Sequence, residues 1–377
     1  MMGKMKGANG VNVARLVERF CSLVAVDNPS YGERAMADAV SEMLLALGAT
    51  IEEDGAAAIV GGNAGNLIAR IPGETGLPTV GFCAHLDSVA PAQGKRAVVF
   101  EDGTIRSAGD TVLGADDLSA VAALLEAVCV LREQGIAHRP IELIFTVCEE
   151  LYTKGSRALD MERLAAREIF VPDLTGAVGT AAIAAPTILA LTVTVTGRAS
   201  HAGFAPEAGI HAIAVAARAL TRCTLGHVDE DTTVGFGIIH GGTASNAVPE
   251  RCVLEGEIRG YDDARAWEEC KRLQDIFEQE CAAAGAAVTV AVEERTRAYT
   301  VEADSAIARR FAGACAAIGV QPTQVRTFGG SDANTFAARG RDTLVIANAM
   351  SSIHSVEEFT TVDELARLCA LLIELMQ

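Results

Sequence analysis

Features that mark specialised classes of protein are scarce in this sequence. The ten cysteines are scattered between Cys21 and Cys369, and no two of them form a CxxC pair. A disulfide framework is not expected in a chain of this size, so the pattern predicts reduced, buried thiols and a cytoplasmic location. The chain has no repeat of fixed period and no low-complexity tract, and half of its residues are hydrophobic, which excludes a disordered protein.

Positive charge is also in short supply. The chain has 31 Lys and Arg residues against 49 Asp and Glu residues, and its formal net charge is −18 at pH 7. Phosphate backbones and anionic membranes repel such a protein, so neither nucleic acid nor a membrane is expected as a partner. The surplus of carboxylates supplies ligands of the kind that hard and borderline cations use.

Neither a leader nor a membrane span is expected. Met1–Gly10 contains lysines but lacks the apolar core and the cleavage site of a secretory leader. Leu174–Gly197 is uncharged, but Pro186 interrupts it, and apolar residues alternate with threonines from Leu191 to Thr196. Alternation of period two predicts a strand, and a spanning helix would need an unbroken apolar core.

The length of 377 residues suits two domains, and the first half of the chain alternates helices with short apolar strands. The predicted helices cover Val11–Val26, Arg34–Leu47 and Leu118–Arg132, and the predicted strands cover Asn66–Ile71, Thr79–Cys83 and Ile141–Val147. Such alternation predicts an α/β fold with a largely parallel sheet.

The segment from Leu189 to about Val292 follows another pattern. Its predicted elements are strand Leu189–Thr196, helix Gly209–Thr221, strands Thr232–Ile239 and Cys252–Ile258, helix Ala264–Ala284 and strand Ala287–Val292. This β-α-β-β-α-β order is the ferredoxin-like unit. Because the α/β pattern resumes at Ser305, we expect a larger domain of residues 1–187 and 294–377 and an inserted domain of residues 188–293.

Metal-binding side chains follow the predicted strands, where the ligands of open α/β sheets gather. His85 and Asp87 come after the strand Thr79–Cys83; the imidazole could bind zinc while the carboxylate holds its other nitrogen, although HxD alone also suits an ordinary hydrogen bond. Asp116 and Asp117 precede the apolar helix. They could cap this helix, or one carboxylate could bridge two cations from an exposed turn.

Glu149 and Glu150 end the buried strand Ile141–Val147. Two adjacent acids in this place are costly to bury unless they are paired or liganded. One of them could ligate a metal while the other accepts a proton from metal-bound water. Asp173, taken alone, is typical of a turn aspartate. His354, taken alone, suits an isolated histidine as well as it suits a metal ligand.

In this order, the residues resemble those of the M20 metallopeptidases, and within them a peptidase T-like branch. The matching motifs are GFCAHLDSVAP, LGADDLSAVAAL, TVCEELYTKGS, VPDLTGAVG, VTVTGRASHAGFAPEAGIHAI, GGTASNAVPE, GGSDANTF and SSIHSVEEF. The resemblance runs from about Val11 to Gln377, and GADD with EE at this spacing is its most specific part. It implies a zinc-exopeptidase-like catalytic domain, with a mostly parallel sheet flanked by helices, and a ferredoxin-like lid and dimerisation domain.

The resemblance implies two zinc ions, with cobalt or manganese as the alternative metals. Asp116 would bridge both ions. His85 would bind one ion, and Glu150 would bind one ion. Asp173 would complete the first site and His354 the second. The resemblance also implies a cis peptide bond between Asp116 and the residue that follows it.

Further roles follow from the same resemblance. Glu149 would be the general base and Asp87 the partner of His85. His201 would polarise the scissile carbonyl, reaching across a homodimer formed through the inserted domain. The remaining substrate contacts would come from Asn246, Arg259, Ser331 and Asp332.

The implied activity is hydrolysis of amide bonds in short peptides, as in a tripeptide aminopeptidase, by a metal-bridged water that Glu149 activates. Two alternatives stay open: a deacylase of N-acyl amino acids or related small metabolites with the same site, and a non-catalytic binding protein. The binding protein is disfavoured because Glu149 and all five candidate ligands are present. Leu118-Ser119 after GADD and Tyr152-Thr-Lys after EEL depart from the relatives near the site and bear on substrate preference.

Overall fold

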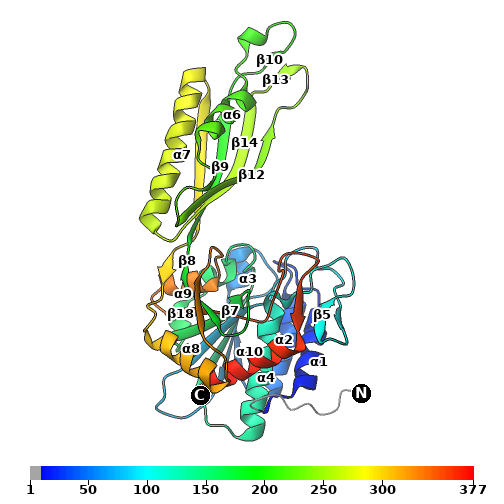
Figure 1. The fold of residues 1–377 in the computed structure, drawn as a ribbon. Helices are drawn as coiled ribbons and strands as arrows, with labels where there is room; N and C mark the ends of the chain where they lie inside the picture. Colours follow the sequence, from blue (N-terminus) through cyan, green and yellow to red (C-terminus); the bar gives the residue numbers. More distant parts are fainter. Residues whose placement is uncertain (1–9) are drawn as a thin grey trace. The chain divides into compact units, whose positions relative to one another are not determined.

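A computed structural model describes residues 10–377 of the chain. The expectation about a leader therefore falls, apart from Gly10, outside the described residues. The chain divides into two units. Unit 1 comprises the segment ending at Ile183 together with Thr300–Thr327 and Ser331–Gln377, and unit 2 comprises Ala184–Tyr299 and Phe328–Gly330 (Figure 1).

Unit 1 is built on a nine-stranded sheet whose centre is parallel, as predicted. Along the path β1-β2-β6-β3-β7-β18-β8, strand β3 pairs in parallel with β6 and β7, and β7 with β18. The bounds are β1 Thr50–Glu53, β2 Leu67–Ile71, β6 Ile141–Thr146, β3 Val80–His85, β7 Glu168–Leu174, β18 Asp342–Ala347 and β8 Thr180–Ala185, with β16 Tyr299–Thr300 and β17 Thr323–Arg326 beside β8. Every residue of β3 and β6 is buried, which is typical of parallel strands covered on both faces.

Two groups of helices accompany this sheet. Helices α1, α8 and α10 contact α4 or one another (Figure 1). Helix α5 contacts both α3 and α9. Their bounds are α1 Val13–Val24, α2 Arg34–Ala46, α3 Ala56–Val60, α4 Ala115–Gln134, α5 Lys154–Ala158, α8 Ala306–Ala317, α9 Asp332–Ala338 and α10 Val362–Met376. Helix α4 is buried without interruption from Ala115 to Leu131, as expected for a helix that is apolar all round. It begins three residues before the predicted start.

Unit 2 has the predicted β-α-β-β-α-β order. Its antiparallel sheet runs β11-β12-β14-β9-β15, and α6 and α7 both pack against β9 and β14. The bounds are β9 Thr187–Thr196, α6 Ala212–Arg222, β11 Gly226–His227, β12 Thr232–Gly241, β14 Arg251–Gly260, α7 Asp263–Ala284 and β15 Ala287–Thr296. Val193, Val195, Ala216 and Phe277 lie in its core.

Short pairings complete the fold. Strands β4 Ala97–Val99, β5 Thr104–Ser107 and β19 Phe359–Thr361 form a three-stranded sheet, and β10 Ser200–His201 pairs with β13 Ala247–Val248. The uncharged stretch Leu174–Gly197 contains β8 and β9, in line with the strand prediction for its second half. Among the described residues, no helix combines the length and the apolar character that crossing a membrane requires.

Candidate active site

The predicted ligands lie where the parallel strands of unit 1 end. His85 is the last residue of β3, and Glu149 and Glu150 follow β6 by three and four positions. Asp173 is the penultimate residue of β7, and Asp116 lies in the first turn of α4. Because the carboxyl ends of parallel strands share one edge of a sheet, residues far apart in the sequence meet here.

Asp116 is at the centre of this cluster. Its Oδ1 lies 3.0 Å from His85 Nε2, and its Oδ2 lies 3.3 Å from His354 Nε2. His354 Nε2 also lies 3.0 Å from Glu150 Oε2. The bond from Asp116 to Asp117 is cis, as predicted. The expected exposure of the turn is wrong, because the two histidines cover Asp116 and leave it 5% exposed.

A second group of ligand atoms adjoins the first. His85, Glu149 and Asp173 each place one nitrogen or oxygen within 4.8 Å of the others, and so do His85, Asp116 and Glu150. The five predicted ligands and the predicted base therefore form one cluster. Their division between two metal ions stays a prediction.

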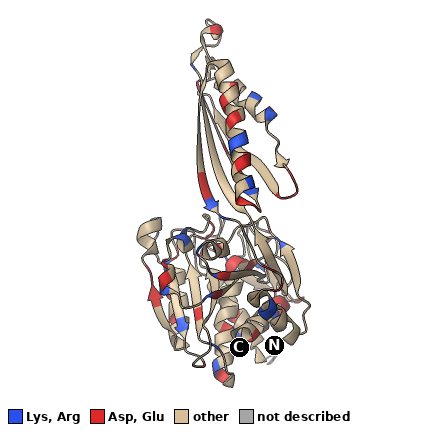
Figure 2. Ribbon diagram, turned by 90° about the vertical axis from the view of Figure 1, so that its left-hand side faces the viewer, with Lys and Arg blue, Asp and Glu red and all other residues tan. Residues whose placement is uncertain are grey.

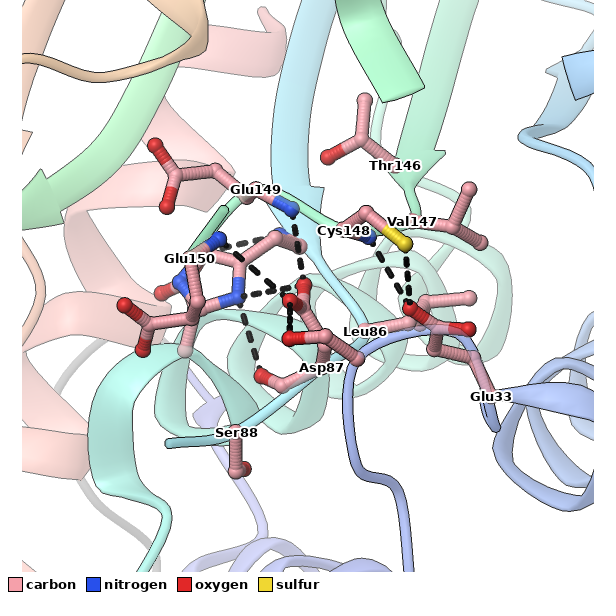
Figure 3. A network of polar contacts seen from close by, with 12 residues as sticks. Glu33, Leu86, Asp87, Ser88, Thr146, Val147, Cys148, Glu149 and Glu150 are labelled. Atoms are coloured by element: carbon pink, nitrogen blue, oxygen red, sulfur yellow. Dashed lines mark hydrogen bonds and ion pairs between the residues drawn. The ribbon is translucent and has the colours of Figure 1, made fainter. Parts of the chain in front are cut away.

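Asp87 organises the loop that carries the two glutamates (Figure 3). Its carboxylate accepts hydrogen bonds from the backbone N–H groups of Glu149 at 3.0 Å and Glu150 at 3.3 Å, and from the Ser30 hydroxyl at 2.7 Å. His85 Nδ1 lies closer to the Asp87 backbone oxygen, at 3.0 Å, than to the carboxylate, at 3.5 Å. The backbone of Asp87 thus provides the nearer partner for the ring, and its side chain mainly orients the glutamate loop.

Glu33 supports the same loop from the opposite side. Figure 3 shows the Glu149 and Glu150 carboxylates on one side of Asp87, and the Cys148 thiol with Glu33 on the other. Glu33 is fully buried and accepts a hydrogen bond from the Cys148 backbone N–H at 2.9 Å. Burial raises the pKa of the Cys148 thiol to about 12, with the Glu33 charge adding to the effect, so this cysteine stays protonated.

The electrostatics of the cluster suit a bound cation. Burial raises the pKa values of Glu149 and Asp173 well above their usual range, and neighbouring acids raise them further. Burial acts in the same direction on Asp116, but hydrogen bonds from His354 and His85 outweigh it and lower its pKa. Hydrogen bonds to Asp116 and Glu150 raise the pKa of His354 to about 10. So many acids in one buried place need protons or metal ions to balance their charge.

The donor set fits zinc. Ligands about 2.0–2.1 Å from a tetrahedral zinc lie about 3.3 Å from one another, close to the spacings of Asp116 from His85 and His354. Oε1 of Glu150 is buried and has no hydrogen-bond partner among the described residues. A buried carboxylate oxygen without a partner is costly, and a metal ion would satisfy it.

Two of the predicted substrate residues lie side by side in unit 2. His201 and Asn246 are exposed, and the N–H of Ala202 donates to the Asn246 backbone oxygen at 2.9 Å where β10 meets β13. His201 Nδ1 accepts the backbone N–H groups of Gly203 at 3.1 Å and Phe204 at 3.2 Å. With Nδ1 acting as an acceptor, the proton of the neutral ring is on Nε2, which is free to donate.

The other predicted substrate residues already have partners within their own units. The Arg259 guanidinium pairs with Glu257 at 2.8 Å and donates to the Phe328 backbone oxygen at 2.6 Å. Ser331 caps α9, and Asp332 accepts a hydrogen bond from the Thr146 hydroxyl at 2.5 Å. Ser331 and Asp332 are both buried. Their contact with substrate stays a prediction.

Sequence reasoning missed two residues that hold the GADD turn. Asn348 donates from its side-chain amide to Asp117, and Glu358 accepts the backbone N–H groups of Gly114 at 2.7 Å and Asp116 at 2.9 Å. A signal for Glu358 was present, since it belongs to a pair of adjacent acids just before a strand, as Glu149 and Glu150 belong to a pair just after one.

Histidines and carboxylates gather at the carboxyl ends of parallel strands, and a candidate base lies beside them. Together with the ferredoxin-like insertion, this arrangement is typical of the class of metal-dependent hydrolases. The model of peptidase family M20/M25/M40 matches residues 81–377. The chain therefore belongs to this peptidase family, which confirms the resemblance drawn from the motifs.

Three relatives cover almost the whole chain. The aminopeptidase PepT from Bacillus cereus has a TM-score of 0.90 at 34% identity, and a tripeptidase from Staphylococcus aureus has a TM-score of 0.94 at 31% identity. Each comparison covers 97% of this chain and 98% of the other. The protein YqjE from Bacillus subtilis is 33% identical over 368 residues, which are 97% of this chain and 99% of YqjE.

Proposed function

We propose that the chain is a dinuclear zinc exopeptidase that removes the amino-terminal residue from short peptides, tripeptides in particular. The observation that carries this proposal is the Asp116 carboxylate, which has one oxygen facing His85 and the other facing His354. Similarity to an aminopeptidase and a tripeptidase over nearly the whole chain supports the choice of substrate.

The chain's own residues supply the metal positions of the proposal. His85, Asp116 and Asp173 would hold one ion, and Asp116, Glu150 and His354 the other. Zinc is the proposed metal because imidazole and carboxylate ligands suit it, and cobalt or manganese are the substitutes that we expect to work. Bound zinc would polarise the scissile carbonyl and make water a stronger nucleophile at neutral pH.

Glu149 carries the proton in the proposed mechanism. Glu149 is 8% exposed and lies beside the ligand cluster, and its backbone N–H donates to the Asp87 carboxylate. Glu149 accepts a proton from the attacking water and later returns it to the leaving amine, as a general base that becomes a general acid. His201 donates from Nε2 to the oxygen of the carbonyl under attack, where negative charge develops.

We also propose a homodimer formed through unit 2. Strand β12 is near the edge of its sheet, where β11 pairs with only two of its residues, and it exposes Ile238 and Ile239. The α7 surface is charged instead, with Lys271 paired to Asp275, and Figure 2 shows acidic and basic residues interspersed along this helix. An apolar edge next to a short strand favours pairing with a second copy.

The cysteines support the proposed cytoplasmic location. All ten are free thiols, and most are buried. A reducing compartment keeps such a chain free of disulfides.

The proposed function is tested by metal removal together with a substrate panel. Dialysis against a chelator should abolish hydrolysis of di- and tripeptides, and zinc or cobalt should restore it. The panel should also contain N-acyl amino acids and N-blocked tripeptides as matched controls. Full activity in a verified metal-free sample would refute the metal mechanism, and faster hydrolysis of N-acyl amino acids than of free tripeptides would make the chain a deacylase.

A further inference from the structure

Glu358 is a buried acid outside the predicted ligand set, and it holds the turn that carries Asp116. It is 1% exposed and lies just before β19, four positions after His354. Its Oε2 accepts the backbone N–H of Gly114 at 2.7 Å, and its Oε1 accepts that of Asp116 at 2.9 Å. These two hydrogen bonds connect parts of the chain that are more than 240 residues apart in sequence.

The start of α4 needs an external acceptor. Gly114, the N-cap, has no side chain, and Asp116 and Asp117 have non-helical backbone angles inside the first turn. Backbone N–H groups at the start of a helix have no partner within the helix. A carboxylate there accepts their hydrogen bonds, and its negative charge is stabilised by the positive end of the helix dipole. Glu358 fills this place, and it therefore fixes the backbone from which the Asp116 carboxylate projects.

The same residue anchors the loop that carries His354. Ser351 and Phe359 exchange two backbone hydrogen bonds of 3.0 Å, which close a loop that contains His354 and ends next to Glu358. His354 has φ of +58° within this loop, a left-handed conformation that a non-glycine residue keeps only where its surroundings hold it. Holding Glu358 against the Asp116 turn thus also holds the His354 loop beside it.

We propose that Glu358 is a positioning residue that holds the Asp116 turn and the His354 loop in place relative to each other. It thereby controls metal affinity at the position formed by Asp116, Glu150 and His354. This inference rests on the proposed two-metal function. Glu358 contacts neither substrate nor metal, and it acts only through the backbone of the turn and the closure of the loop.

The test compares the two metal affinities of the full chain. The metal-stripped wild type, Glu358→Ala and Glu358→Gln are titrated with Co²⁺ and followed by calorimetry and visible absorption. Removing a group that orients a metal ligand typically lowers affinity by about 10–100-fold, so Glu358→Ala should lose this much at the position that contains both Asp116 and His354. The loss should be smaller at the other position, which shares only Asp116. Glu358→Gln should fall between, because its amide keeps one of the two acceptor oxygens.

Two matched variants make the result specific. Glu357→Ala changes the adjacent acid, whose side chain is 80% exposed, and it should titrate like the wild type. His354→Ala removes a ligand of the more affected position, so adding Glu358→Ala to it should produce a smaller further loss there than Glu358→Ala does alone, because only the part that acts through Asp116 remains. Excess metal should restore kcat to Glu358→Ala without a change in KM, which a general loss of folding would not allow.

The outcomes separate this inference from the proposed function. A wild-type chain that does not bind two ions refutes the two-metal function, whatever the variants do. If the wild type binds two ions and Glu358→Ala keeps both affinities, or loses both equally, the positioning role is wrong. Circular dichroism checks the fold of each variant, and Glu358→Gln decides the test if Glu358→Ala does not fold.

Discussion

The two units hold their predicted site residues in opposite ways. In unit 1, His85 is 2% exposed and Asp116 is 5% exposed. Hydrogen bonds from their own backbone N–H groups to the buried carboxylates of Glu358 and Asp87 hold Asp116 and Glu149 in place. In unit 2, His201 and Asn246 are exposed where two short strands meet.

This difference follows from what each set of residues is proposed to do. Burying several acids together is destabilising unless cations neutralise them, and the same burial strengthens every electrostatic interaction with a bound ion. An exposed histidine gains no such strength, but it can meet a substrate or a second copy of the chain. In the proposed mechanism, unit 1 thus holds the metal ions and the proton carrier, and unit 2 contributes recognition of the substrate and a donor to the developing oxyanion.

The largest expected effect comes from Glu149, the buried residue of unit 1 that is proposed to carry a proton rather than to bind metal. Glu149→Gln keeps the size of the side chain but removes its ability to accept a proton. We expect turnover to fall by about 10²–10⁴-fold, the usual range for loss of a general base, while the metal content stays near that of the wild type. Zinc per chain and turnover are measured on the same sample.

Glu150→Gln is the matched control for this variant. It makes the same chemical change one residue away, but it replaces an anionic metal ligand with a neutral one, so metal content should fall together with activity. A Glu149→Gln enzyme that retains full activity with metal bound would rule out the proton-transfer role. Loss of metal from Glu149→Gln but not from Glu150→Gln would exchange the two assignments.

The next effect concerns unit 2 and the dimer. His201→Ala removes one donor to the developing oxyanion, so we expect kcat to fall by about 10²–10³-fold without loss of metal. If His201 acts across a dimer, mixing His201→Ala with Glu149→Gln should restore about a quarter of wild-type activity, because half of the randomly formed dimers contain one complete site. Each variant mixed with itself is the control. Mixtures that stay as inactive as their components would assign His201 to its own chain.

The sequence predicts the site best where a motif is local. His85 with Asp87, and Glu149 with Glu150, each follow an apolar run of the kind that forms a buried parallel strand, and both strands are confirmed. Asp173 was different, since β7 was not predicted. Pro172 lies inside β7, although proline is uncommon in central strands, so no strand signal marked Asp173 as a strand-end ligand.

Contacts between distant segments were beyond such reasoning. Glu358 caps a turn that comes more than 240 residues earlier, and nothing in the local sequence around either segment specifies the other. In unit 2, by contrast, periodicity alone predicted the order of the main strands and helices, because each amphipathic element has one face on a common core. The order of elements follows from local patterns, whereas the supports of a buried site depend on the tertiary fold.

The smallest expected effect compares one lysine from each unit. Lys95 in unit 1 is 1% exposed, and its ammonium donates to the backbone oxygens of Val24 and Val26 and to the Asn28 side chain. Burial lowers the pKa of Lys95 to about 8, against the opposing charges of Asp27 and Glu358. The unfolded chain keeps this proton up to about pH 10.5, so between these values it binds more protons than the folded chain.

The free energy of unfolding should therefore rise with pH through this window in the wild type relative to Lys95→Met. The full gain is about 3 kcal/mol, and it is absent below about pH 8, where both states of the wild type carry the charge. The matched variant in unit 2 is Lys271→Met, because Lys271 is exposed and pairs with Asp275 across one helical turn. Water screens that pair, so its removal should leave the pH slope unchanged.

Urea unfolding with chelator present, at several pH values, measures both slopes without a contribution from metal binding. Equal slopes for the wild type and Lys95→Met would mean that the three acceptors around the Lys95 ammonium fully replace its lost hydration, and that unit 1 holds this charge as easily as unit 2 holds an exposed one.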